Sequence, residues 1–166
     1  MKPLNIVLHE PEIPQNTGNI ARTCACTGAV LHLIEPLGFS LDEKHVKRAG
    51  LDYWSDVTIF RYRDYQDFLE KNPGARIWMA TTKALHTYTE VSYQPGDFIM
   101  FGKETKGIPE EILVEHPDDC IRIPMRENFR SLNLSNSAAI VLYEALRQLD
   151  FAGLQETGSL HHLHWR

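Results

Sequence analysis

Apolar runs of three to five residues alternate with polar, turn-forming segments along most of the chain. Runs of this length, bounded by turn signals such as Gln94-Pro95-Gly96-Asp97, are typical of buried strands. Strands are predicted over residues 4–8, 30–34, 57–60, 77–81, 98–101 and 120–123.

Helix start and stop signals stand between most of these strands. Gly28 suits the left-handed position that ends a helix. Asp64 is a candidate N-cap, Asn72-Pro73-Gly74 would stop the helix that it begins, and Pro109 fits a first helical turn. Strands that alternate with helices in this way predict an α/β fold with a mostly parallel sheet flanked by helices. Helices are predicted over about residues 17–27, over the basic segment 42–49 before Gly50, from Asp64 to 72, and over about 109–115.

The last predicted helix, from about Leu134 to Leu149, has the most regular pattern. Its apolar residues recur three or four positions apart, which is the spacing of one helix face. The chain after Gly153 lacks such a pattern and is expected to be loosely held. We therefore predict one domain over residues 1–152 and a tail over residues 153–166. The apolar helix positions are Ala138, Val141, Leu142, Ala145, Leu146 and Leu149.

The composition fits a soluble protein with one core. Of its 166 residues, 43% are hydrophobic and 23% are charged, which is ordinary for a globular domain. No apolar run approaches the roughly 20 residues that span a bilayer, and the residues after Met1 lack the apolar stretch of a signal peptide. A cytoplasmic protein without a membrane segment is expected.

Cysteine and histidine form no pattern typical of a metal site. Cys24, Cys26 and Cys120 match no zinc spacing, and buried free thiols are expected. Three histidines near the C-terminus lack an accompanying carboxylate or cysteine, so no metal is predicted. These are His161, His162 and His164.

Basic residues gather in groups although the formal net charge of the chain is −5. Such groups bind phosphate in nucleic-acid-binding proteins, but they are also found as solvated faces without a partner. From charge alone, solvated faces are the favoured interpretation. The groups are Lys44, His45, Lys47 and Arg48; Arg61 and Arg63; and Arg122, Arg126 and Arg130.

Three segments of unusual composition follow predicted strands, where α/β sheets bind their ligands. The first, residues 12–22, places Asn16, Thr17 and Gly18 at a helix start, whose free N–H groups can bind an anion. Arg22 lies one turn after Gly18 and is expected to project near that end. A capped helix that carries a surface arginine explains the same residues.

The second segment, residues 101–107, directly follows an apolar strand. Gly102 and Gly107 allow tight turns and the close approach of a ligand. The segment is not a P-loop, because Ile108-Pro109 follows the second glycine, and the chain has no GxGxxG pattern of a dinucleotide site. It is therefore either a cofactor loop of another type or a turn.

The third segment runs from Ile123 to Ser137 and places small polar residues at the start of the last helix. An N-cap uses one or two of them, so the others can bond to a polar ligand. They are Ser131, Asn133, Ser135, Asn136 and Ser137.

In this order and at this spacing, the three segments resemble the three motifs of SPOUT-class RNA methyltransferases. The resemblance is to the TrmH-like branch and is closest to its YibK-type members. It covers about residues 4–150 and leaves out the tail, and no single segment would carry it. Supporting stretches are Asn5-Ile6-Val7-Leu8, Ile34-Glu35-Pro36-Leu37-Gly38-Phe39, Arg48-Ala49-Gly50-Leu51-Asp52-Tyr53 and Val91-Ser92-Tyr93.

The resemblance implies an α/β domain whose C-terminal part is a deep trefoil knot, with S-adenosylmethionine bound in the knot loops. General rules of chain connection argue against a knot, so that expectation rests on the resemblance alone. Adenine is expected among Ile123, Leu132 and backbone amides. The implied cofactor residues are Ala80, Thr81, Phe101, Gly102, Glu104, Gly107, Ile123, Met125, Ser131, Leu132, Asn133 and Asn136.

The implied reaction transfers a methyl group from a sulfonium to a ribose 2′-hydroxyl, with Arg22 at the hydroxyl and Asn16 nearby. The methyl donor is already activated, so the protein has to position the two partners and assist the hydroxyl, without a metal. Arginine is almost never deprotonated. We therefore expect Arg22 to stabilise the developing alkoxide or to hold the neighbouring phosphate.

YibK-type relatives are homodimers whose sites combine both subunits, and the helix 134–149 is a candidate contributor to the interface. They lack a separate RNA-binding domain, so the dimer surface is expected to hold the tRNA anticodon arm. The implied substrate is the wobble nucleotide 34, a C or a modified U, of leucine tRNAs.

Three alternatives stay open. The same chemistry could act on another tRNA or rRNA position, although such relatives usually carry a further domain. A non-catalytic RNA-binding relative is the second, and the intact Asn16, Arg22, Glu104, Ser131 and Asn133 argue against it. The third is an α/β protein of another nucleotide-binding kind, for which no motif is present.

Overall fold

The computed structural model describes residues 1–42 and 54–166. The basic helix predicted over residues 42–49 lies outside the described residues except for its first position, Asp42. The basic group from Lys44 to Arg48 and the stretch from Arg48 to Tyr53 lie outside them as well.

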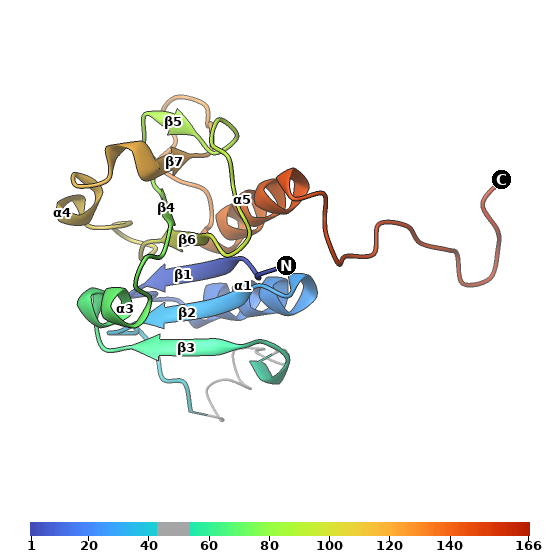
Figure 1. Cartoon of the computed structure of the whole chain (residues 1–166), viewed down its shortest axis with the longest axis horizontal. Coiled ribbons are helices and arrows are strands. Elements are labelled where there is room, and N and C mark those ends of the chain that lie inside the picture. The colour runs from blue at the N-terminus through green and yellow to red at the C-terminus, as the bar shows by residue number, and fades with distance from the viewer. Residues whose placement is uncertain (43–53) are drawn as a thin grey trace.

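One seven-stranded sheet forms the centre of the molecule, in the order β3-β2-β1-β6-β4-β7-β5 (Figure 1). Every pairing between these strands is parallel, so the predicted parallel sheet is confirmed. The strands are β1 (Asn5–His9), β2 (Val30–Ile34), β3 (Ile59–Tyr62), β4 (Ile77–Ala80), β5 (His86–Thr87), β6 (Phe98–Phe101) and β7 (Cys120–Arg122).

Apart from bounds that differ by one residue, two strands differ from the prediction. Strand β3 begins at Ile59 instead of Val57, because Ile59 is the first residue in register with β2, opposite Leu31. Strand β5 was not predicted, since its two residues are too few to show an alternating pattern. It joins the sheet only through β7, where His86 lies opposite Ile121.

The helices lie between the strands, as predicted, but two of their bounds differ by two residues or more. Helix α1 begins at Pro14, three residues before the predicted start, because a proline in the first turn gives up no hydrogen bond. Helix α4 ends at Leu113 instead of 115, and Pro117 follows shortly after it. The described helices are α1 (Pro14–Thr27), α3 (Tyr65–Lys71), α4 (Glu110–Leu113) and α5 (Leu134–Gln148), with short 3₁₀ turns at Trp54–Asp56 and Pro117–Asp119.

The predicted helix ends are confirmed at two places. Gly28 follows α1 with a φ of 77°, and its N–H donates to the Cys24 carbonyl. The Asp64 carboxylate accepts a hydrogen bond of 2.8 Å from the Asp67 N–H at the start of α3. Both contacts satisfy backbone groups that a helix end leaves unpaired.

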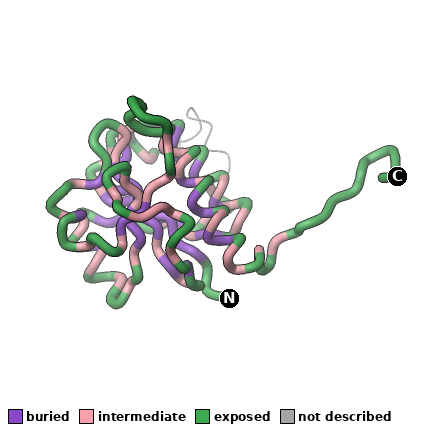
Figure 2. The backbone as a smooth tube through the Cα atoms, turned by 90° about the horizontal axis from the view of Figure 1, so that it is seen from above, coloured by how far each residue is buried: buried purple, intermediate pink, exposed green. Residues whose placement is uncertain are grey.

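Two apolar clusters cover the two faces of the sheet, and the buried backbone gathers at the centre (Figure 2). On β1, Ile6 and Leu8 face α1 and α5, whereas Val7 faces the cluster that contains Phe68 of α3. Burying one such side chain contributes roughly 1.5–3 kcal/mol. The apolar face predicted for α5 is confirmed, since its residues Ala138, Val141, Leu142, Ala145 and Leu146 are buried.

The cysteines are only partly as predicted. Cys24 and Cys120 are buried free thiols, but the prediction is wrong for Cys26, which is exposed. Cys24 points into the core from α1, and a residue two positions later points to the other side of the helix.

Beyond α5 the tail extends away from the body (Figure 2) and residues 155–166 are exposed. Its treatment as a separate segment stays a prediction. Within the described residues, no helix is both long and apolar enough to cross a bilayer. No group of three potential metal ligands comes together in the same part of the chain.

A chain of polar side chains crosses the buried side of β2. Asn72 donates to the Tyr62 hydroxyl, which lies 2.8 Å from Nδ1 of His32. Nε2 of His32 lies 2.9 Å from Oδ1 of Asn5. The Asn5 amide donates to backbone carbonyls, which leaves its oxygen to accept from the imidazole. The neutral ring satisfies both partners.

This burial makes stability depend on pH. Burial lowers the pKa of His32 to about 4, from an ordinary value of 6.5. The unfolded chain therefore takes up a proton on this ring first, and stability falls as the pH drops from about 6.5 towards 4. Between pH 7 and 4.5 we expect the protonation of His32 to lower the free energy of unfolding by about 2–3 kcal/mol. Urea unfolding of wild type and His32→Gln at both pH values measures it. An equal loss in both proteins would contradict this account.

Candidate cofactor site

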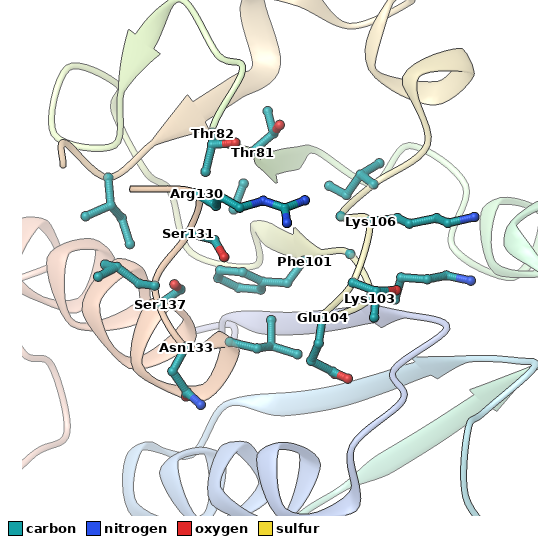
Figure 3. Close-up of a pocket in the computed structure, with 18 of the residues that line it drawn as sticks. Thr81, Thr82, Phe101, Lys103, Glu104, Lys106, Arg130, Ser131, Asn133 and Ser137 are labelled. Atoms are coloured by element: carbon teal, nitrogen blue, oxygen red, sulfur yellow. The ribbon is translucent and has the colours of Figure 1, made fainter. Parts of the chain in front are cut away.

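A cavity of about 860 Å³ lies beyond the carboxyl ends of β4, β6 and β7, next to the starts of α1 and α5 (Figure 3). This is the edge at which parallel sheets bind ligands, and the volume is within the range of small-molecule sites. All but one of the residues predicted to bind the cofactor line it, and Asn136 does not. The lining includes Ala80, Thr81, Phe101, Gly102, Glu104, Gly107, Ile123, Met125, Ser131, Leu132 and Asn133.

The second segment is a tight loop that leaves β6 and returns on itself. The Gly107 N–H donates to the Lys103 carbonyl at 2.8 Å, and Gly107 has a φ of 70°. A Cβ atom on Gly102 would lie 1.9 Å from the Gly107 carbonyl carbon and 2.1 Å from the Ile108 nitrogen. The glycine at position 102 is therefore required by the close approach of two backbone segments.

Two carboxylates join the second segment to the residues before α1. The Glu104 carboxylate accepts from the Glu12 N–H at 2.9 Å and from the Ile13 N–H at 2.8 Å. In return, the Glu12 carboxylate accepts from the Thr105 hydroxyl at 2.7 Å and from the Thr105 N–H at 3.1 Å. We call this set of four bonds the carboxylate clasp. Charge-assisted bonds of this kind are stronger than neutral ones.

The pKa values of the two carboxyls of the clasp are shifted in opposite directions. Burial raises the pKa of Glu104, whereas the hydrogen bond from the Thr105 hydroxyl lowers the pKa of Glu12. Glu104 lines the cavity, but its carboxylate already accepts hydrogen bonds from the backbone N–H groups of Glu12 and Ile13. Its predicted contact with a cofactor stays a prediction, and its visible contribution is to shape the cavity wall.

The third segment meets the first through two asparagines. The Asn133 side chain caps α5 by accepting from the Asn136 N–H at 3.2 Å, and its Nδ2 donates to Oδ1 of Asn16 at 3.1 Å. Asn16 is buried and lines the cavity. Asn136 therefore contributes its backbone to the cap, and the cluster of small polar residues serves both the helix start and the cavity.

Arg22 does not line the cavity; it is exposed on α1. The prediction placed it beside the helix start because that start was expected near residue 17. Since α1 begins at Pro14, Arg22 is eight residues along the helix, about 12 Å from its first residue. Within one chain, the structure therefore brings Asn16 to the cavity but does not bring Arg22 to it.

Cationic side chains around the cavity were not among the predicted site residues. Lys103 pairs with Glu10 at 3.1 Å and Lys83 with Glu110 at 2.8 Å. Lys106 and Arg130 also line the cavity, and neither has an ion pair with a described residue. Lys103 and Lys106 stand in the second segment itself, so its composition held the signal. The cavity is therefore rimmed by positive charge although the chain is acidic overall.

The predicted basic groups divide into two regions. Arg130 lines the cavity, and Arg126 is exposed in the same segment. Arg61 and Arg63 lie at the end of β3, where Arg61 pairs with Glu35. The group with Arg126 and Arg130 therefore adjoins the cavity. The group with Arg61 and Arg63 lies at the edge strand β3, and its charge is partly neutralised by Glu35.

The cavity fits a ligand with both flat apolar and polar parts. Phe101, Ile121 and Ile123 give apolar walls, while Thr81 and Ser131 offer hydroxyl groups beside them. Because Gly102 lacks a side chain, backbone can approach a ligand closely there. The fold and the site thus define an α/β protein with a nucleoside-sized site at the carboxyl edge of a parallel sheet.

Comparison with known proteins places the chain among RNA-modifying enzymes. Residues 3–143 match the SpoU rRNA methylase family. A tRNA (cytidine(34)-2′-O)-methyltransferase from Escherichia coli (strain K12) is 53% identical over 151 residues, which are 90% of this chain and 96% of that protein. The chain belongs to the SpoU methylase family and is a methyltransferase.

Solved structures agree. One solved structure is described as structural insights into the 2-OH methylation of C/U34 on tRNA. It is 45% identical to this chain, with a TM-score of 0.84, and the match covers 90% of this chain and 97% of that one. An AdoMet-bound rRNA methyltransferase from Sinorhizobium meliloti is 25% identical, with a TM-score of 0.77, over 89% of this chain but 57% of that one. The resemblance to this branch of methyltransferases is confirmed; the trefoil knot stays a prediction.

Proposed function

We propose that this protein methylates the ribose 2′-hydroxyl of nucleotide 34 in tRNA, with S-adenosylmethionine as the methyl donor. The observation that carries the proposal is the identity of 53% to the Escherichia coli tRNA (cytidine(34)-2′-O)-methyltransferase across 96% of its length. The cationic rim suits a polyanionic substrate. As in the sequence-based prediction, the substrates are leucine tRNAs with C or a modified U at the wobble position.

Methylation of rRNA is the second candidate, because the matching family is described by that activity. The Sinorhizobium meliloti rRNA enzyme has a longer chain, of which this one covers 57%, whereas nearly the whole of the tRNA enzyme is covered. Because this chain covers nearly the whole length of the tRNA enzyme, the comparison favours tRNA over rRNA as the substrate.

The residues of the cavity position the reaction. S-adenosylmethionine, when bound, supplies an activated methyl group on a sulfonium. Phe101, Ile123 and Leu132 would hold the flat adenine part, Ser131 and Thr81 would bond to polar groups of the cofactor, and the Gly102–Gly107 loop would shield it from water. Asn16, fixed by Asn133, lies at the side where the ribose enters. As the 2′-hydroxyl loses its proton to solvent and its oxygen takes the methyl group, Arg22 would stabilise the developing alkoxide or hold the adjoining phosphate.

Because Arg22 lies away from the cavity of its own chain, its role requires a second subunit. We propose a homodimer in which each site combines residues of both chains. The exposed apolar side chains Ile140 and Tyr143 of α5, 37% and 45% exposed, suit such an interface. Helix α5 packs against α1, which carries Arg22.

Light scattering at micromolar concentration is expected to give twice the chain mass of 19.1 kDa. The double variant Ile140→Asp/Tyr143→Asp should give one chain mass, since two carboxylates cannot be buried unpaired in an interface. Val114→Asp, at a side chain that is 70% exposed beyond α4, is the control and should stay dimeric. A wild-type mass of one chain would contradict the dimer.

The test of function is a map of ribose methylation. Purified protein is incubated with S-adenosylmethionine and unmethylated leucine tRNA, and nuclease fragments are analysed by mass spectrometry. A gain of one methyl group on the ribose of nucleotide 34 is expected. Methylation at another nucleotide, or of rRNA alone, would replace the proposed substrate. The same assay on a strain that lacks the gene shows whether the modification depends on this protein.

A further inference from the structure

One large aromatic side chain stands exposed beside the cavity. Phe129 is 66% exposed, in a segment without helix or strand between β7 and α5. Met125 and Arg130, on either side of it in the sequence, both line the cavity. Asn128 has a φ of 71°, a left-handed conformation that bends the chain just before Phe129.

Two arginines flank this aromatic residue in the sequence. Arg126 and Arg130 are exposed, and neither forms an ion pair with another described residue. In Figure 3 the Arg130 side chain extends across the cavity above Phe101 and Ser131. Aromatic rings flanked by arginines are the combination with which proteins hold unpaired nucleotides: the ring stacks on the base, and the guanidinium groups contact phosphate.

The Phe129 side chain has no packing role within the described part of the protein. The ring lies in neither apolar cluster, and no ring contact involves it in the described part of the chain. Burying a phenylalanine side chain contributes roughly 1.5–3 kcal/mol, and this contribution is absent while the ring is exposed. A flat apolar partner that arrives from solution can supply it.

We propose that Phe129 is a stacking platform for an unpaired base of the RNA substrate, next to the nucleotide that is methylated. The inference rests on the proposed function, because the cavity beside Phe129 is taken to hold the methyl donor. A ribose that enters the cavity must leave its helical stack, and its neighbour then offers an open face. Stacking on Phe129 holds that neighbour and fixes the entry of the ribose.

The test compares substitutions at one position by their RNA affinity. Phe129→Ala should raise the Kd for unmethylated tRNA by about 5- to 100-fold, the range for one lost base stack. Phe129→Trp should restore the affinity, because it keeps a π face. Phe129→Leu should not, although it keeps the apolar character. Val114→Ala, at another exposed apolar side chain, is the matched control and should bind as wild type.

The salt dependence of the tRNA affinity distinguishes a stacking contribution from a charge contribution. The slope of log Kd against log salt should be unchanged in Phe129→Ala, whereas Arg126→Ala should reduce it by about 0.7–0.9, as for one phosphate contact. Wild-type affinity of the leucine variant would overturn the proposal, since it would show an apolar contact without stacking. A change of oligomeric mass in Phe129→Ala would also overturn it, by placing the ring in a subunit interface. If wild-type protein methylates a different nucleotide while Phe129→Ala still loses affinity, the stacking stands and the assignment to nucleotide 34 fails.

Discussion

Replacing Arg22 by alanine is expected to lower the single-turnover rate of methyl transfer by about 10²–10³, the usual effect of removing one charge-stabilising donor. The affinity for S-adenosylmethionine should stay within twofold of wild type, because Arg22 does not line the cavity. Arg22→Lys should not restore the rate, since a point charge cannot reproduce the planar donors of a guanidinium group. A rate equal to that of wild type would remove Arg22 from the mechanism.

Lys71→Ala is the control for a general effect of lost charge. Lys71 is an exposed cation on α3, on the opposite face of the sheet, and it pairs with Asp67 at 3.1 Å. Such surface pairs contribute about 1 kcal/mol or less, so this variant should methylate as wild type. The proposed homodimer gives a second check. If Arg22 acts on the partner subunit's site, mixing Arg22→Ala with a variant that is defective in the cavity should restore activity in mixed dimers.

Gly102→Ala is expected to abolish methylation by displacing the second segment. The new methyl group would lie 1.9 Å from the Gly107 carbonyl carbon, so one of two backbone segments has to move. A displacement of about 1 Å at a reacting centre is enough for a 10²-fold loss of rate. Calorimetry with S-adenosylhomocysteine should show no binding in the range where wild type saturates.

The control for this change is Gly74→Ala. Gly74 has a φ of 75°, but a Cβ atom there would meet nothing within 4 Å. Only the strain of the left-handed conformation remains, about 1–2 kcal/mol of stability. Ligand binding should be unchanged in this variant. If Gly102→Ala binds S-adenosylhomocysteine as tightly as Gly74→Ala does, the cavity is not the cofactor site.

The sequence predicted the layers of the fold because strand and helix patterns here are local. The parallel sheet, the apolar face of α5, the Asp64 cap and the Gly28 end each depend on a few neighbouring residues. Element bounds were less certain for a physical reason: Pro14 can either precede a helix or occupy its first turn. That ambiguity of three residues moved Arg22 away from the expected helix start.

The site could be predicted in composition but not in its internal contacts. Glu104 and Asn133 were expected to bond to a ligand, yet they bond to Glu12, Ile13 and Asn16, more than 90 residues away in the chain. Spacing in the sequence carries no information about such partners. The lysines at the cavity were not predicted, because lysines near a loop are common and only the cavity distinguishes these.

The carboxylate clasp has a thermodynamic consequence for the order in which substrates bind. Because Glu12 and Glu104 each bond to the other's segment, residues 101–107 and the start of α1 cannot shift independently. A ligand that fixes one of them lowers the entropic cost of fixing the other. Linkage makes this effect reciprocal, with coupling energies that are typically about 1–3 kcal/mol. If the methyl donor binds at residues 101–107 and the RNA at the start of α1, we expect each to strengthen the binding of the other. The four hydrogen bonds of the clasp already join the two segments without either ligand.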